Sequence, residues 1–319
     1  MLRSWLGTLV FRCYVRAVRR RLRAGRDRES RAEGLLRRAR EALIRGGDCV
    51  AFMRVGLQSL AMPLSHQLPV YRAMCASLDQ LLPNLARAHQ AAGVEFVFVD
   101  VGANVGDTVA LVHDVAPDAR FVCIEGHARY AGLLRANIAS LGIDAEVIEA
   151  CCGDGTGGAW AVTDDEHGTA RLARGGVDVA VPLMTTLDQV SSESARARSV
   201  TVLKIDTDGW DLRVLRGAAA LIRERHPIVY LEWHPALLRE GGDDPASLFP
   251  MLASAGYTHA RLYGNRGIPL ATRRLAPDLG VESEARIDGK AVEYLDILAW
   301  RPEHDAVIAQ LMALEGQQA

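Results

Sequence analysis

Residues 97–106 read VFVDVGANVG, an apolar run that ends in an acid and is followed by a bend with two glycines. Such a run is typical of a buried strand, and glycines after a first strand let the backbone turn sharply beside a ligand. A dinucleotide fingerprint would need G-x-G-x-x-G, but Asn104 stands where the middle glycine should be. We therefore expect a different ligand, with Asp100 facing it.

The charge of this bend predicts the class of ligand. A carboxylate at Asp100 suits a ligand with positive charge and an amino group, and it repels a pyrophosphate. S-adenosylmethionine fits, because it carries an ammonium and a sulfonium, while its single carboxylate can meet the start of the next helix. Glu125 follows Asp100 by 25 residues and ends the next apolar run, where a carboxylate accepts hydrogen bonds from both ribose hydroxyls. The alternative is that Asp100 caps a helix and Glu125 is solvated.

From residue 94 onward, short β-branched runs alternate with amphipathic segments, which is typical of βαβ units and a mostly parallel sheet. Strands are expected over 95–101, 120–125, 145–150, 201–206, 227–233, 257–263 and 293–300. Helices are expected over 104–115, 130–141 and 212–224. The glycine-rich stretch 153–176 predicts a loop with a hairpin, and 177–184 alternates like an edge strand. The fold class is therefore α/β and Rossmann-like.

Candidate catalytic residues lie at the ends of the fourth and fifth expected strands. Asp206 and Asp208 lie at or just beyond the end of one strand, and Glu232 and His234 have the same place on the other. If the spacing of two continues along each strand, both members of a pair share a face. Three interpretations stay open: His234 or Asp206 is a general base, the four side chains bind Mg²⁺ or Mn²⁺, or the acids only cap helices. No metal site is certain from this pattern.

Further segments extend the pattern along the chain. Residues 186–188 read TLD, 202–212 read VLKIDTDGWDL, 215–218 read LRGA and 227–234 read PIVYLEWH. Together with the glycine bend, they resemble the FkbM family of S-adenosylmethionine-dependent methyltransferases over about residues 94 to 300. Two positions depart from the family pattern, since Asp208 stands where the family usually has Glu and Gly126 where it usually has Pro.

The resemblance implies a seven-stranded class I methyltransferase sheet with S-adenosylmethionine at the carboxyl ends of its first strands. It also implies methylation of oxygen on small molecules, sugars or glycans. The residues expected to bind the cofactor are Asp100, Gly102, Asn104, Gly106, Glu125, Asp154 and Asp206, with Asp154 placed to receive the adenine amino group. The residues expected to carry catalysis are His234, Asp206, Asp208 and Glu232.

The N-terminal region differs in charge from the rest of the chain. Residues 1–45 carry 14 arginines against four acids, a balance of +10, which leaves −12 for the remainder of a chain whose net charge is −2. Helical spacing predicts a basic amphipathic first helix over 1–23, with the apolar stripe Leu2, Trp5, Leu6, Leu9 and Cys13. We expect a helical extension over 1–92, a methyltransferase domain over 93–302 and a C-terminal helix or tail over 303–319.

Two roles for the first helix stay open: peripheral contact with an anionic membrane, or docking on its own acidic domain. A nucleic-acid partner is not expected, because no recognised DNA or RNA module accompanies the basic residues. Six cysteines without CxxC spacing and no long apolar run indicate a cytoplasmic protein, placed at the inner membrane face if the helix binds lipid. The alternative to an enzyme is an inactive methyltransferase fold that acts as a scaffold recruited by this helix. The sequence leaves the oligomeric state open.

Overall fold

The computed structural model describes residues 2–75, 79–156, 160–164, 170–174, 183–264, 267–275, 286–287, 290–291 and 294–317. Its centre is an eight-stranded sheet in the order β13-β12-β16-β11-β10-β3-β4-β5. The strands are β3 (Val97–Val101), β4 (Arg120–Ile124), β5 (Ala145–Ile148), β10 (Val202–Ile205), β11 (Ile228–Trp233), β12 (His259–Gly264), β13 (Pro269–Arg274) and β16 (Leu295–Trp300).

Five of these strands run parallel, as the βαβ pattern predicts. β3 pairs in parallel with β4 and β10, while β5 and β11 extend the sheet on either side. β16 is antiparallel to both β11 and β12, and β12 and β16 correspond to the strands expected over 257–263 and 293–300. The expected count of seven strands is one too low, because β13 adds an exposed edge strand. Because β13 is exposed, its sequence lacks the alternating apolar pattern that would predict a strand.

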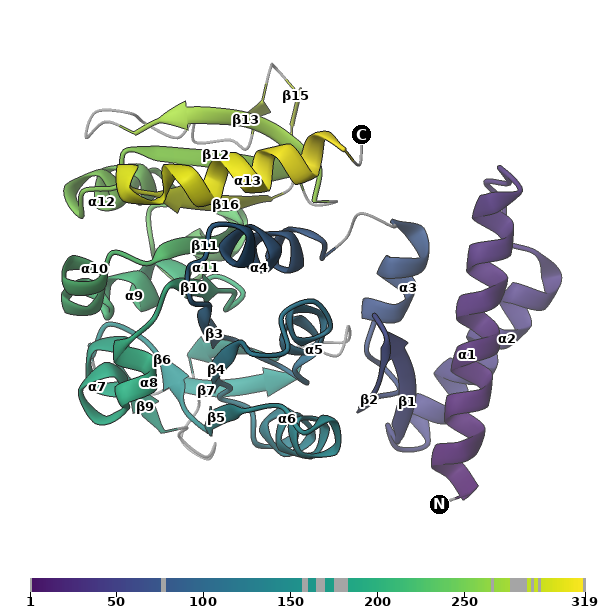
Figure 1. The fold of residues 1–319 in the computed structure, drawn as a ribbon. Helices are drawn as coiled ribbons and strands as arrows, with labels where there is room; N and C mark the ends of the chain where they lie inside the picture. Colours follow the sequence, from purple (N-terminus) through teal and green to yellow (C-terminus); the bar gives the residue numbers. More distant parts are fainter. Residues whose placement is uncertain are drawn as a thin grey trace.

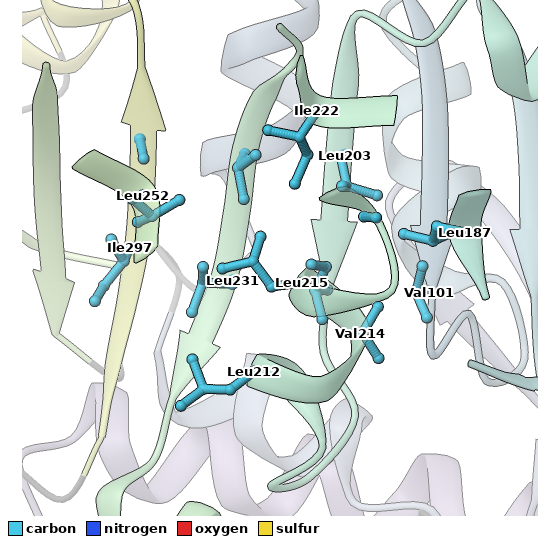
Figure 2. Packing of buried hydrophobic residues seen from close by; sticks show 14 of the residues in the cluster. Val101, Leu187, Leu203, Leu212, Val214, Leu215, Ile222, Leu231, Leu252 and Ile297 are labelled. Atoms are coloured by element: carbon cyan, nitrogen blue, oxygen red, sulfur yellow. The ribbon is translucent and has the colours of Figure 1, made fainter. Parts of the chain in front are cut away.

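Helices cover both faces of the sheet (Figure 1). In chain order they are α4 (Leu81–Ala91), α5 (Asp107–His113), α6 (Ala128–Leu141), α7 (Leu187–Glu193), α8 (Ala195–Arg198), α9 (Asp211–Arg216), α10 (Ala219–Arg225), α11 (Pro235–Glu240), α12 (Leu248–Ser254) and α13 (Asp305–Gly316), with 3-10 turns η1 (Pro245–Ser247) and η2 (Pro302–His304). Figure 2 shows one apolar layer, in which Leu203 and Leu231 of the strands meet Leu215 and Ile222. This apolar layer holds the strand ends in place.

Smaller hairpins and pairs surround the sheet. β6 (Cys151–Cys152) pairs with β9 (Met184–Thr185), β7 (Trp160–Asp164) with β8 (Ala170–Arg174), and β14 (Arg286–Ile287) with β15 (Lys290–Ala291). The β7–β8 pair confirms the hairpin expected within 153–176. Most of the expected edge strand at 177–184 lies outside the described residues, and only β9 is seen at its end.

Residues 2–74 form a cap beside the sheet domain, and it is not all-helical. It contains α1 (Leu2–Arg23), α2 (Arg31–Arg45), the hairpin strands β1 (Val50–Val55) and β2 (Gln58–Pro63), and α3 (Leu68–Met74). The expected helical extension is therefore wrong over the hairpin. Ala51, Met53 and Val55 alternate with exposed residues, and Gly56 takes a positive φ of 59° at the turn.

The first helix docks through a face that the sequence did not predict. Phe11, Tyr14, Val15 and Val18 are buried against the hairpin, whereas the expected apolar stripe remains exposed. The basic helix does dock on its own chain, but the surface that it covers is the hairpin of the cap. None of the described helices is both long enough and apolar enough to cross a bilayer.

One buried amide fastens the cap to the sheet domain. The Asn137 side chain on α6 accepts a hydrogen bond from Ala61 N at 2.8 Å and donates to Ala61 O at 2.9 Å. It also donates to Val105 O at 2.9 Å, within the glycine bend. Because one side chain satisfies backbone groups of both parts, it fixes the cap beside the bend.

Candidate active site

A cavity of about 280 Å³ opens at the carboxyl ends of β3, β10 and β11. We call it the acidic cavity, because seven carboxylates line it. They are Asp79, Asp107, Glu125, Asp206, Asp208, Glu232 and Asp296. The cap closes one side with His66, Gln67, Leu68 and Tyr71. Ligands of open α/β sheets bind at this end of the strands, so the acidic cavity is the candidate active site.

The glycine bend after β3 has the shape that the sequence predicts. Gly102 has a φ of +81°, and a Cβ there would overlap the carbonyl oxygen of Asp206. Gly106 has a φ of +83° and precedes α5, while Asn104 has a φ of +48°. Gly102 and Asn104 line the acidic cavity, but Gly106 does not. Only glycine accepts both the positive φ and the close approach at position 102 without strain.

Glu125 lies between the bend and the end of β4. Its Oε2 accepts a hydrogen bond from Asn104 N at 2.8 Å, and its Oε1 accepts one from His127 N at 2.7 Å. Burial raises its pKa. Each carboxylate oxygen retains a further lone pair. Glu125 therefore holds the bend in shape and can still accept hydrogen bonds from a ligand.

Glu125 also lines a second, smaller cavity of about 60 Å³, here called the narrow cavity. The two cavities share Gly102, Glu125 and Asp206. The other walls of the narrow cavity are mostly apolar, formed by Val101, Ile124, Ala150, Cys151, Cys152, Val162 and Leu172 with Gly126, His127 and Thr207. An apolar slot next to a polar cavity suits an elongated ligand with a flat ring at one end.

Asp100 does not face the cavity, contrary to our expectation. It is fully buried, and its Oδ1 accepts a hydrogen bond from Lys204 Nζ at 2.8 Å. Lys204 Nζ also lies 3.3 Å from Asp206 Oδ2. Burial lowers the pKa of Lys204, but the two carboxylates raise it more, so the ammonium persists. Asp100 therefore positions Lys204, and its charge is already matched inside the protein.

The remaining carboxylates make the acidic cavity attractive to cations. Burial, with the nearby Asp79 carboxylate adding to it, raises the pKa of Asp107 to about 7. Burial raises the pKa of Asp296 to about 7 and that of Glu232 well above its usual range. Lys204 is the only Lys or Arg among the described lining residues. A ligand with positive charge would relieve this repulsion.

Three of the four expected catalytic residues come together in this cavity. Asp206, Asp208 and Glu232 line it, whereas His234 does not. His234 Nδ1 instead accepts a hydrogen bond from Leu237 N at 3.4 Å, and its ring stacks on Tyr294 at 5.8 Å. Because β11 ends at Trp233, His234 is the N-cap of α11 and leaves the alternation of the strand. The strand-spacing argument was wrong at that residue.

Asp154 also takes a role other than the expected one. Its Oδ2 lies 3.1 Å from Arg216 Nε, and its Oδ1 accepts a hydrogen bond from Thr156 N at 3.1 Å. It lines neither cavity. Within the described parts of the chain, no three His, Cys, Asp or Glu side chains are grouped to hold a metal ion.

The cap contributes a histidine that sequence reasoning missed, because no motif marks it. His66 is 5% exposed, and its Nδ1 accepts a hydrogen bond from Leu68 N at 3.3 Å. Burial lowers its pKa to about 4, so the ring is neutral at pH 7 and carries its proton on Nε2. His66 lies at the wall of the acidic cavity, and its side chain interacts with that of Asn104 in the glycine bend. Residues 66 and 125 are far apart in sequence, and only the docking of the cap brings them together.

A family model matches the central part of the chain. Residues 100–258 match the family model described as the methyltransferase FkbM domain. These residues include the glycine bend, Glu125 and the acids at the carboxyl ends of β10 and β11. A search of curated proteins finds no significant match.

Solved methyltransferase structures are similar to the chain at low identity. The FkbM methyltransferase from Methylobacillus flagellatus KT is 16% identical with a TM-score of 0.38; the match covers 64% of this chain and 43% of that one. This chain thus spans less than half of that relative. A putative caffeoyl-CoA O-methyltransferase from Staphylococcus aureus is 11% identical, with coverage of 69% and 82% and a TM-score of 0.38. The METTL16 methyltransferase domain is 12% identical, with coverage of 76% and 73% and a TM-score of 0.38.

Proposed function

Because residues 100–258 place this chain in the FkbM family of methyltransferases, with a class I methyltransferase fold, we propose that it is an S-adenosylmethionine-dependent O-methyltransferase. The acceptor that we propose is a hydroxyl of a small molecule, sugar or glycan. S-adenosylmethionine supplies an electrophilic methyl group on a positively charged sulfur. The chain must hold that cofactor, exclude water and take a proton from the acceptor.

The residues present fit this cofactor. Glu125 joins the two cavities, so its carboxylate can accept hydrogen bonds from ribose hydroxyls while the apolar walls of the narrow cavity hold the adenine. The carboxylates of the acidic cavity suit the cationic methionine end, a role that the sequence had given to Asp100. Gly102 keeps the backbone close to the ligand because a side chain there would not fit.

Asp206 is the general base in this proposal. Nearly half of its side chain is exposed, and Lys204 holds one of its oxygens at 3.3 Å. An acceptor hydroxyl beside Asp206 can transfer its proton to the carboxylate as its oxygen attacks the methyl carbon. Glu232 and Asp208, on the same wall, would orient further hydroxyls of the acceptor.

A single observation carries the proposal: the glycine bend, Glu125 and three acids at the carboxyl ends of β10 and β11 line one cavity. A cofactor held by the first group therefore lies beside the second. This proximity is what an in-line transfer of a methyl group requires.

The test measures transfer of labelled methyl groups to a panel of polyhydroxylated acceptors. We expect Asp206→Asn to lower turnover by roughly 100-fold or more, as loss of a general base does. His234→Ala is the control, because His234 lies outside the cavity and should keep near-normal turnover. Equal loss in both variants would contradict the assignment of Asp206. Cofactor binding without transfer to any acceptor would favour the inactive scaffold instead.

A further inference from the structure

The cap carries a groove of about 570 Å³ that no part of the proposed reaction uses. Five arginines line it, and we call it the arginine groove: Arg12, Arg16 and Arg19 from α1, Arg54 from β1 and Arg72 from α3. No acidic residue is among its described lining residues. Five guanidinium groups around one hollow repel each other unless anions lie between them.

The partners of these arginines leave most of their charge unmatched. Arg12 Nε donates to the carbonyl oxygen of Phe52 at 3.0 Å, and Arg54 Nε donates to that of Gly56 at 3.2 Å. Carbonyl groups orient a guanidinium without neutralising it. Arg72 forms an ion pair with Asp79 at 3.1 Å. The sequence of α1 supplies seven arginines and no acid.

The same helix exposes large apolar side chains at its other end. Leu2 is 80% exposed, Trp5 62%, Leu6 41% and Leu9 45%. Steps of three or four residues place Leu2, Trp5 and Leu9 in line with Arg12, Arg16 and Arg19 on one stripe of the helix. The opposite stripe is buried against the hairpin, so the apolar row of this face remains exposed. In Figure 1 the hairpin and α3 lie between α1 and the sheet domain.

We propose that this face of α1, together with the arginine groove, docks on an anionic phospholipid surface. The tryptophan and leucines enter the interface between headgroups and acyl chains, while the arginines contact lipid phosphates. A soluble phosphate compound would account for the groove alone. The exposed row of apolar side chains that continues the same stripe favours a membrane, because transfer of these side chains out of water lowers the free energy.

Docking of this kind holds the active site close to the lipid surface. α3 is shared by both features: Pro69 and Arg72 line the arginine groove, whereas Leu68 and Tyr71 line the acidic cavity. The inference does not depend on methyl transfer, since it rests on the charge and exposure of the cap.

The test is sedimentation of the full chain with vesicles of phosphatidylcholine containing about 30% phosphatidylglycerol, and with vesicles of phosphatidylcholine alone. We expect binding to the anionic vesicles only. The double variant Arg16→Gln/Arg19→Gln should bind them roughly 30-fold less tightly. Trp5→Ser/Leu9→Ser should also lose binding, although its net charge is unchanged.

The matched control is Arg273→Gln/Arg274→Gln, which removes the same charge from two exposed residues of β13. It should bind the anionic vesicles almost as well as the natural chain. Equal loss in both arginine pairs would mean that net charge alone drives binding, and it would overturn the proposal. An absence of sedimentation with anionic vesicles would also overturn the proposal. This holds even if pyrophosphate binds the chain through Arg16 and Arg19.

Discussion

The acidic cavity and the arginine groove lie on either side of α3 and carry opposite charge. Seven carboxylates and one lysine line the cavity, whereas five arginines and no described acid line the groove. Both are hollows that a ligand can enter, yet each repels the ligand that suits the other. A net charge of −2 therefore conceals two surfaces with opposite preferences.

The two surfaces also differ in how their charges are held. In the sheet domain, Lys204 is buried between Asp100 and Asp206, so its charge is matched by the protein itself. In the cap, Arg12 and Arg54 are exposed and held by backbone carbonyls. Substitutions in the cavity should therefore change folding stability, and those in the groove should change binding with little effect on stability.

The largest effect is expected from Lys204→Met. Removing this cation leaves Asp100 buried and unpaired, which costs about 3–5 kcal/mol of the free energy of unfolding, as measured by urea denaturation at pH 8. Without its cation, Asp100 has a folded pKa above its unfolded value, so the cost is absent below about pH 4 and grows as pH rises. Arg273→Met, at an exposed site, should change stability by less than about 0.5 kcal/mol. A cost that does not vary with pH would contradict this account.

The next effect concerns the repulsion among the cavity acids. The pKa of Asp107 is raised to about 7, so the folded state binds more protons than the unfolded state between about pH 4 and 7, and stability falls across that range. Asp107→Asn should therefore stabilise the protein by about 1–2 kcal/mol at pH 8 and change it little at pH 4. The measurement is urea denaturation across pH, with Asp118→Asn as the exposed control. Destabilisation at pH 8 would contradict the raised pKa of Asp107 that burial and the nearby acids produce.

A smaller effect distinguishes His234, the N-cap of α11, from the cavity residue Asp206. His234→Ala removes the acceptor for Leu237 N and should lower the free energy of unfolding by about 0.5–1 kcal/mol. Asp206→Asn should change stability less, because its side chain is partly solvated. Thermal denaturation of both variants tests the contrast. The assignment fails if the two variants lose stability equally.

The smallest effect tests whether the cavity and the groove are linked. Arg72→Gln breaks the 3.1 Å ion pair with Asp79, which joins a wall of the groove to a wall of the cavity. We expect binding to anionic vesicles to fall roughly fivefold, whereas the Kd for S-adenosylmethionine changes less than about threefold. A large change in cofactor affinity would show that the two surfaces are coupled.

The sequence predicts the sheet domain better than the cap. The segments VFVDVGANVG and VLKI have the alternating or continuous apolar pattern that is typical of strands. Their expected parallel pairing is confirmed. Asp100 was expected to face the ligand, yet Lys204 pairs with its carboxylate and takes its charge away from the ligand. Lys204 lies opposite Asp100 in the register of two adjacent strands, which explains their contact. The sequence of either strand alone does not show this register.

In the cap, the residues that matter depend on docking. The first helix was correctly predicted, but the stripe that is buried contains Phe11 and Val18 and is not the expected one. His66 lines the active-site cavity only because Asn137 and the hairpin fix the cap beside the glycine bend. Contacts between segments so far apart leave no local pattern in the sequence.

The central claim is that Glu125 and the glycine bend hold S-adenosylmethionine. Calorimetric titration of the full chain with this cofactor tests it most directly. We predict one site per chain, with binding weakened roughly 10- to 100-fold by Glu125→Gln, because hydrogen bonds to a charged group are lost. Glu149→Gln, at the exposed pair with Arg135, should leave the affinity unchanged. No heat of binding for the natural chain at millimolar cofactor, or equal affinity in the Glu125→Gln variant, would contradict the account.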